Sequence, residues 1–503
     1  MVSFLLYFRR ALIVATLGLG WGMFGADVSL RLVNQRELFL DDAVLETLHG
    51  VDARLATPVP AGVVLKFDDP WEGKFSGAFV SIIRDQNLFR MYYRGAGGIG
   101  GGKDEITCYA ESEDGMRWRK PKLGLVEAKG NRDNNILLGY HPERYTHNFA
   151  VLLDDRPGVP AAQRYKAVGG GMTTSAESKA TGAVRGLYRF VSADGIHWEK
   201  VPGEPLFKGY ALDTQNVLAW IPAENCYAVY LRMWTEDEPG KPHWRGVRLI
   251  ARSISKDFVT WSEPERMTYG DTPLEDLYTN ATHPYFRAPQ LLIAMPFRFA
   301  PERRILPQTE LEALRVDKSM WSGVSDAVIL TSRGGATYQR KFMESFVRPG
   351  PDRINWAARS TIPALGVIPT GPAEMSFFVT RAYGTPECRL ERMTLRTDGF
   401  ASLHAGYPAG YAITKPLALA GNALVANFAT SSIGFVKIAV LDERGAEISG
   451  FTAMDAIELA GDRIDEPVKW KSGKTIADLG GRTVRLKFIL RDADMYSFGA
   501  FER

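Results

Sequence analysis

A seven-residue pattern, Ser-x-Asp-Gly-x-x-Trp, recurs along the chain and restricts the folds that it can adopt. It reads SEDGMRW at 112–118 and SADGIHW at 192–198, while SKDFVTW at 255–261 and SRGGATY at 332–338 are looser copies. An alternating apolar run precedes each copy, and Asp-Gly favours a tight turn between antiparallel strands. We therefore predict a hairpin at each copy, with its Trp packed between neighbouring sheets.

Two more strand-like segments precede each hairpin, which gives about four strands in each unit. The first unit offers GAFVSIIRD and LFRMYYRG, the next two units follow the same plan, and a fifth runs from AEMSFFVTR to CRLERMTLRTDGF. Four-stranded units in series are typical of β-propellers. We predict an all-β fold with a five-bladed β-propeller over 27–400, closed by pairing of RELFLDDAVLE (36–46) with the last blade. Unrelated hairpins in a large sandwich are the alternative.

The repeat is absent from the last hundred residues. Segments such as GFVKIAVLDERGAEISGF and RTVRLKFILRDADMYSFGAF still read as closely spaced strands. Short strands at regular intervals are typical of a sandwich. We predict a jelly-roll-like β-sandwich accessory domain over 401–503. Bracing of the propeller is favoured over contact with a ligand, because the segment shows no cluster of aromatic residues.

The N-terminal residues resemble an export signal. Arg9 and Arg10 precede the apolar run from Ala11 to Leu19, which gives way to small residues near Gly25. That order is typical of a signal peptide, and the paired arginines also fit twin-arginine export. We predict a signal at 1–26 and an extracellular or periplasmic mature protein, with an uncleaved membrane anchor as the alternative. No later segment has 18 uninterrupted apolar residues.

Composition excludes several classes of function. The formal net charge is only +3, so no strong positive field points to nucleic acid. The three cysteines, Cys108, Cys226 and Cys388, lie far apart without zinc-ligand spacing. We expect buried thiols, with one disulfide pair as the less favoured reading. We expect no nucleic acid partner, no membrane contact after signal removal, no metal and no cofactor.

The amino-acid sequence resembles the five-bladed propeller glycosidases of glycoside hydrolase families 32 and 43, and is most similar to their secreted branch. The resemblance rests on the repeats together with RELFLDDAVLE, HNFAV (147–151), DTQN (213–216), TDGF (397–400) and RLKFILRDADMYSF (485–498). It covers nearly the whole mature chain. It implies a propeller fold and activity on carbohydrate, in a superfamily that also contains transferases, phosphorylases and inactive binders. The invertase-type WMNDPNG and RDP motifs are missing, so the resemblance assigns no catalytic residue.

The antiparallel arrangement of a blade indicates where a ligand would bind. The start of the innermost strand and the end of the next strand lie at one mouth of the central tunnel. Polar residues recur at both places. Predicted inner-strand starts supply Glu72, His147, Asn148, Asp213, Asn280, His283 and Glu374, and predicted second-strand ends supply Arg94, Arg232, Arg298 and Arg381.

Glycoside hydrolysis needs one carboxyl group as acid and another as base or nucleophile. Asp213 and Glu374 are our candidate pair, with Glu72 third. The shorter Asp suits the base or nucleophile and the longer Glu suits the acid, whose pKa its neighbours must raise. Each of these carboxylates could equally pair with an arginine of the same mouth in a purely structural role.

The arginines suggest an acidic sugar, because guanidinium binds carboxylate or sulfate at two points. Ion pairs that fasten blades together are at least as good a reading. We also count Trp71 as a stacking face, although core packing is the usual role of Trp. His147 and His283 could contact sugar hydroxyl groups, and metal ligation is a minority reading for two histidines without a third ligand. Our substrate-binding candidates are Arg94, His147, Asn148, Arg232, His283, Arg298 and Trp71.

The sequence thus predicts an exported glycoside hydrolase whose catalytic carboxylates lie at the tunnel mouth. Its predicted partner is a carbohydrate, and an acidic sugar is one candidate. A non-catalytic carbohydrate-binding propeller is the alternative from another class. A polysaccharide lyase that uses His147 and Arg232 is a third possibility. The sequence leaves the sugar, the stereochemical outcome and the oligomeric state open.

Overall fold

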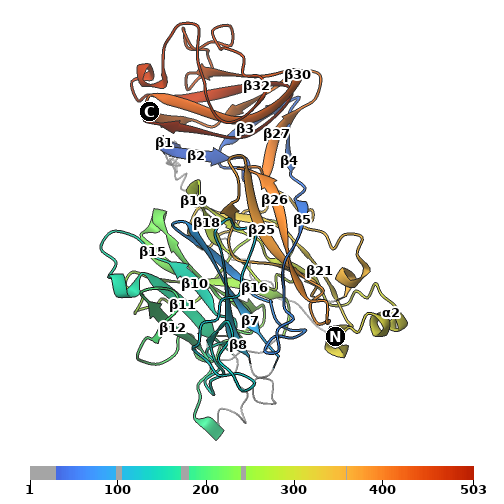
Figure 1. Cartoon of the computed structure of the whole chain (residues 1–503). Coiled ribbons are helices and arrows are strands. Elements are labelled where there is room, and N and C mark those ends of the chain that lie inside the picture. Colours follow the sequence, from blue (N-terminus) through green and yellow to red (C-terminus); the bar gives the residue numbers. More distant parts are fainter. Residues whose placement is uncertain (1–29, 98–104, 172–179, 239–244, 358) are drawn as a thin grey trace, which may run out of the picture.

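The chain folds into five radial blades, which comprise six sheets, and one further, curled sheet (Figure 1). The structure is a computed structural model, and it describes residues 30–97, 105–171, 180–238, 245–357 and 359–503. The predicted export signal at 1–26 lies outside these residues. Within them, no helix has the length and apolar character needed to cross a bilayer.

Blades I, II and III are four-stranded antiparallel sheets whose strands follow the order of the chain. Blade I contains β6 (Ser81–Asp85), β7 (Leu88–Gly95), β8 (Ile106–Ser112) and β9 (Ile136–Leu138). Blade II contains β10 (Ala150–Leu153), β11 (Tyr165–Gly170), β12 (Leu187–Ser192) and β13 (Glu199–Lys200). Blade III contains β14 (Val217–Ile221), β15 (Cys226–Trp234), β16 (Arg248–Ser255) and β17 (Glu265–Arg266).

Blades IV and V depart from this plan. In blade IV a three-stranded sheet is extended by a separate strand pair, and blade V includes a strand from the beginning of the chain. Blade IV contains β18 (His283–Tyr285), β19 (Ala288–Ala294), β20 (Phe297–Ala300), β21 (Val324–Ala327) and β22 (Leu330–Ser332). Blade V contains β23 (Thr361–Pro363), β24 (Ile368–Pro369), β25 (Glu374–Arg381), β26 (Arg389–Arg396) and β5 (Val59–Lys66). The five-bladed propeller predicted from the repeat is confirmed.

Helical structure is confined to short segments between strands. The insertion between β20 and β21 holds the α-helix α2 (Gln308–Ala313). The 3-10 helices are η1 (Ala161–Gln163), η2 (Pro222–Glu224), η3 (Lys318–Met320), η4 (Arg353–Trp356) and η5 (Ile476–Leu479).

The repeated pattern forms the turn that follows the third strand of a blade. In the second copy Ser192 Oγ accepts the amide of Gly195 at 2.9 Å, and Asp194 Oδ1 accepts the amide of Ile196 at 2.8 Å. Gly195 has φ of +75°, and a Cβ there would lie 2.7 Å from the Tyr92 hydroxyl, so glycine is required. Trp198 packs edge-on against Tyr92 of blade I, with ring centroids 6.2 Å apart. The predicted position of this Trp between neighbouring sheets is confirmed.

The strand that closes the ring is not the predicted one. β5 pairs antiparallel with β26 over Val59–Lys66 and so supplies the outer strand of blade V (Figure 1). In the predicted segment 36–46, β2 (Gln35–Leu38) instead pairs with the C-terminal strand β32. Alternating apolar residues predict a strand but not its partner, which explains the error.

The ten-stranded sheet combines both ends of the described chain. Its strands are β1 (Leu30–Val33), β2, β3 (Leu45–His49), β4 (Asp52–Leu55), β27 (Ala401–Ala405), β28 (Gly410–Thr414), β29 (Leu417–Ala420), β30 (Ala423–Leu441), β31 (Asp462–Pro467) and β32 (Thr483–Phe501). It surrounds its own apolar core, which includes Phe39, Phe428 and Phe488. The three cysteines are free and buried, as predicted.

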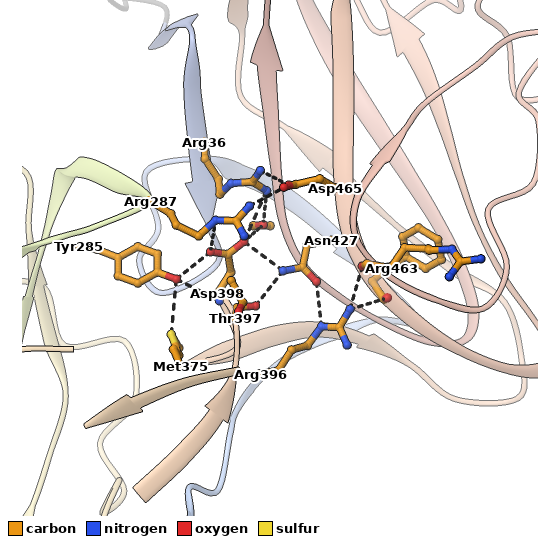
Figure 2. A network of polar contacts seen from close by, with 12 residues as sticks. Arg36, Tyr285, Arg287, Met375, Arg396, Thr397, Asp398, Asn427, Arg463 and Asp465 are labelled. Carbon is orange, nitrogen blue, oxygen red and sulfur yellow. Dashed lines mark hydrogen bonds and ion pairs between the residues drawn. The ribbon is translucent and has the colours of Figure 1, made fainter. Parts of the chain in front are cut away.

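Asp398 joins the propeller to this second sheet (Figure 2). Its side chain is fully buried in the turn after β26. Oδ1 accepts the Tyr285 hydroxyl of blade IV at 2.8 Å, and Oδ2 accepts Ser497 of β32 at 2.7 Å. Arg36 of β2 and Arg287 of blade IV each place a guanidinium nitrogen 3.4 Å from the carboxylate. One buried anion therefore satisfies donors from both parts of the molecule.

We expect Asp398→Asn to lower the free energy of unfolding by about 3 kcal/mol, near the lower end for a broken buried ion pair. The change removes the fully buried carboxylate beside Arg36 and Arg287 and leaves them only the partly exposed Asp465 as counter-charge. Both carboxylate oxygens of Asp398 accept hydrogen bonds. The side-chain amide nitrogen of Asn, in either orientation, would therefore face another donor. Asn tolerates the φ of +64° found here, so backbone strain does not explain the loss. Chemical denaturation measures the effect. The matched control is Asp52→Asn, whose exposed pair with Arg54 at 3.5 Å contributes little. Equal stability of the two variants would contradict this assignment.

Candidate functional site

The tunnel mouth brings inner-strand starts and second-strand ends together, as antiparallel geometry requires. Arg94 lies at the end of β7 in blade I, and Asn148 precedes β10 in blade II. The Arg94 guanidinium donates from Nη1 to Asn148 Oδ1 at 3.2 Å. Its Nη2 donates to the Tyr383 hydroxyl after β25 of blade V. Arg94 thus connects three blades at one end of the tunnel.

A buried imidazole between two carboxylates forms the centre of the mouth. His147 Nδ1 contacts Glu105, which precedes β8, and Nε2 lies 3.2 Å from Asp213 Oδ1, which precedes β14. The His147 side chain is 2% exposed, whereas Asp213 is 34% exposed. Asp213 is therefore the carboxylate of this group that a ligand can reach most readily.

The charges of the group hold both carboxylates ionised. Burial alone raises the pKa of Glu105, but the positive charges of His147 and Arg94 outweigh it and lower the pKa to about 2. Burial also opposes ionisation of Asp213, and the hydrogen bond and charge of His147 hold its pKa well below the usual range. Burial disfavours the imidazolium, yet Glu105 and Asp213 together raise the pKa of His147.

Three guanidinium groups surround the aromatic ring of Tyr278 beside this group. The Cζ atom of Arg232 lies 4.1 Å from the ring centroid, that of Arg248 4.9 Å and that of Arg359 5.1 Å. Arg232 also donates to the Tyr278 carbonyl oxygen at 3.0 Å. Tyr278 lies just ahead of β18 of blade IV, whereas Arg232 and Arg248 lie on β15 and β16 of blade III. Arg359 precedes β23 of blade V, so the arginine cluster lies where blades III, IV and V meet.

A cavity of about 870 Å³ lies next to the cluster, between blades IV and V. Phe299 lines it and packs edge-on against Tyr278 with ring centroids 6.0 Å apart. The remaining lining includes Glu275, Asp276, Arg298, Arg303, Asp326, Arg348 and Trp356. Its mixture of aromatic and charged groups suits a polar organic ligand.

Of the predicted site residues, Arg94, His147, Asn148, Asp213 and Arg232 come together at the mouth. Arg298 instead lines the cavity and forms ion pairs with Asp326 at 2.6 Å and Glu275 at 2.9 Å. His283 is half-buried, with Nδ1 2.9 Å from the Ala281 carbonyl oxygen, and loss of contact with solvent lowers its pKa.

Glu374 does not join Asp213. It lies at the start of β25, which is the second strand of blade V rather than the innermost. Arg381, at the other end of β25, donates a hydrogen bond to Thr361 at the start of the inner strand. Glu374 is therefore about 23 Å from Arg381 along β25, at the end of the strand away from that start. The Glu374 carboxylate contacts Arg392 at 2.9 Å and Thr370 at 2.8 Å. The structure does not assemble the predicted pair.

Glu72 and Trp71 are occupied elsewhere in blade I. The Glu72 side chain is fully buried and accepts hydrogen bonds from Lys120 at 2.7 Å and the Tyr93 hydroxyl at 2.7 Å. Burial raises its pKa. Trp71 donates to Asn135 at 2.8 Å and packs in the core of the blade. Both residues have structural partners that account for them.

Sequence reasoning missed Glu105, Tyr278, Arg359 and Tyr383. Glu105 could have been found, because the start of a third strand lies beside the end of the second, here Arg94 paired with Thr107. Within the described ranges, no group of three or more His, Cys, Asp or Glu side chains is placed to hold a metal ion.

No family model matches the sequence, and neither does any curated protein. Similar solved structures do exist. One described as a glycoside hydrolase is 12% identical, with a TM-score of 0.44, and covers 68% of this chain and 92% of its own. A Bacillus subtilis family 43 arabinoxylan arabinofuranohydrolase solved with cellotetraose is 9% identical (TM-score 0.39; 86% and 97% covered). A Bombyx mori family 32 β-fructofuranosidase is 8% identical (TM-score 0.38; 90% and 95% covered).

These neighbours include members of families 43 and 32, the families that the repeats resemble. The chain is a five-bladed β-propeller.

We expect His147→Gln to lower the free energy of unfolding by about 3 kcal/mol, near the lower end for a broken buried ion pair because Asp213 is partly exposed. The raised pKa of His147 stabilises the fold below the ordinary value of 6.5, and this contribution is lost as pH rises through the raised pKa. The lowered pKa of Glu105 stabilises the fold above 4.5, and this is lost as pH falls towards about 2.

The stability difference between wild type and His147→Gln should therefore be greatest between about pH 4.5 and 6.5. Urea unfolding across a pH series measures it. The control is His197→Gln, because His197 is 71% exposed in its pair with Asp194. A difference that does not change with pH would count against the ionised arrangement.

Proposed function

We propose that the chain binds a glycan at the propeller mouth and that Asp213 contacts it. The observation that carries the proposal is the partly exposed Asp213 carboxylate, held in place by the buried His147. An ionised carboxylate accepts hydrogen bonds from sugar hydroxyl groups, and the cavity beside the cluster adds aromatic surface from Phe299 and Trp356.

Hydrolysis of the bound glycan is the second candidate. It is favoured by the presence of two carboxylates, Asp213 and Glu105, on either side of one imidazole. Asp213 fits the role of base or nucleophile because it stays ionised. The proton donor is harder to supply, since the pKa of Glu105 is also lowered and the raised pKa of Glu72 belongs to a fully buried group. Binding without cleavage is therefore our first choice.

We expect Asp213→Asn to weaken glycan binding by about tenfold to a hundredfold, the effect of losing hydrogen bonds to a charged group. Calorimetry against a panel of neutral and acidic oligosaccharides measures binding, and chromatography of the same mixtures detects cleavage. Glu374→Gln is the matched control, because Glu374 lies at the far end of β25. If the control loses binding and Asp213→Asn retains it, the proposed site is wrong. Cleavage products that disappear in Asp213→Asn would favour hydrolysis over binding alone.

We also propose that the protein works outside the cytoplasm, on the basis of the N-terminal arginines and the apolar run that follows them. The full chain carrying a C-terminal tag should be recovered from the periplasm or the medium. Replacement of Arg9 and Arg10 by Gln should retain it in the cytoplasm. Cell fractionation followed by immunoblotting provides the measurement, and a cytoplasmic wild-type chain would overturn the proposal.

A further inference from the structure

The arginine cluster around Tyr278 contains more positive charge than its protein neighbours balance. Arg248 pairs with Asp276 at 2.9 Å. Neither Arg232 nor Arg359 forms an ion pair with any carboxylate among the described residues. By contrast, Arg94 and Arg381 at the same mouth have acidic partners, Glu105 at 3.3 Å and Glu391 at 3.4 Å.

Asp213 attracts Arg232 only from beyond ion-pair distance. It forms an ion pair with His147 and none with Arg232. The central group of the mouth is already balanced, because Arg94 and His147 supply two positive charges against those of Glu105 and Asp213. Arg144 approaches Glu105 as well, at 3.8 Å. The charges of Arg232 and Arg359 are therefore in excess.

The guanidinium of Arg232 is also short of hydrogen-bond acceptors. The residue is 3% exposed, and among the described residues the only acceptor of its N–H groups is the Tyr278 carbonyl oxygen. Its Nε is buried without a partner, and so is Nε of Arg359. A buried cation whose donors are unsatisfied destabilises a fold, so such a group calls for an explanation.

The cluster is bordered by the mouth and by the cavity, although neither Arg232 nor Arg359 lines that cavity itself. On one side Arg232 is attracted electrostatically by Asp213, the one-third exposed carboxylate of the mouth. On the other side Arg359 lies 5.5 Å from the ring centroid of Phe299, which lines the cavity of about 870 Å³. The excess charge thus lies between the mouth and the cavity.

We propose that Arg232, supported by Arg359, binds an oxyanion carried by the sugar, either the carboxylate of a uronic acid or a sulfate ester. The inference rests on the proposed glycan-binding function and names the class of glycan. Guanidinium presents several N–H donors in a plane that matches two oxygens of such a group. The ligand would supply both the missing negative charge and the missing acceptors. The Tyr278 ring, which packs against Arg232 and Arg359, keeps their guanidinium groups in place.

The test uses Arg232→Met, which keeps an unbranched apolar side chain and removes the charge and the donors. We expect affinity for galacturonic acid oligomers or for galactose 6-sulfate to fall by about tenfold to a hundredfold, and affinity for neutral galactose oligomers to stay the same. Comparison of the uronate with the sulfate identifies which oxyanion is preferred. Arg117→Met is the control, because Arg117 is 92% exposed on a blade turn.

Stability provides a second and independent readout. If the charge of Arg232 is balanced only when a ligand is bound, Arg232→Met should leave the melting temperature of the ligand-free protein unchanged or raise it. Inorganic sulfate should raise the melting temperature of the wild type and not that of Arg232→Met. A purely structural Arg232 predicts the reverse, a large loss of stability in Arg232→Met with no change in ligand preference.

The outcomes separate this inference from the proposed function. Equal weakening of neutral and acidic ligands in Arg232→Met would overturn the oxyanion site and leave glycan binding intact. Stabilisation by sulfate that requires Arg232, without binding of any sugar, would support the oxyanion site and overturn the glycan function. Loss of stability with unchanged preference would reject the inference outright.

Discussion

Ring closure through β5 is the constraint on which the rest of the structure depends. A radial array of sheets is stable only when its first and last blades meet, and here the outer strand of the last blade comes from residues 59–66. Since β5 runs along blade V, the residues before it emerge beside the second sheet and add four strands to it. The buried Asp398 then connects blade IV, β2 and β32 at the point where the chain leaves the propeller. Closure of the ring and attachment of the second sheet are thus two results of one chain path.

The mouth contrasts two ways of using buried charge. Around His147 every ionised group faces an opposite charge, which fixes the geometry of Asp213. Around Tyr278 the guanidinium groups outnumber the carboxylates, and the aromatic ring rather than an acid holds them in place. The charges around His147 balance one another within the protein, whereas the excess positive charge around Tyr278 needs an anionic ligand to balance it. This contrast, unlike the number of arginines alone, gives a physical reason to consider an acidic glycan.

The fold and part of the site follow from local sequence patterns. Ser192, Asp194 and Gly195 satisfy each other's turn contacts within a few residues, so the hairpin and the position of Trp198 can be read directly. The antiparallel rule also placed Arg94, His147 and Asp213 at one mouth, because it needs only the order of strands within a blade.

The rule failed where strands were assigned wrongly. The inner strand of blade V consists of short pieces that contain Pro363 and Pro369, so AEMSFF was taken for the inner strand and Glu374 was placed at the wrong end. The same limit applies to 36–46, because a strand pattern does not reveal a partner more than four hundred residues away. Arg359 and Tyr278 escaped notice because their role depends on packing between blades rather than on any motif.

The pairing of β5 with β26 and of β2 with β32 also shapes how the molecule is made. Gln35 meets Ala500, and Lys66 meets Arg389, so early strands wait for partners that the ribosome adds hundreds of residues later. Contacts this distant carry a high entropic barrier to loop closure and slow the acquisition of native structure. Blades I to III can form from consecutive hairpins as they emerge, whereas the exposed edges of β2 and β5 remain vulnerable to aggregation until late in synthesis. A nascent chain of this kind gains from chaperone protection of its first strands.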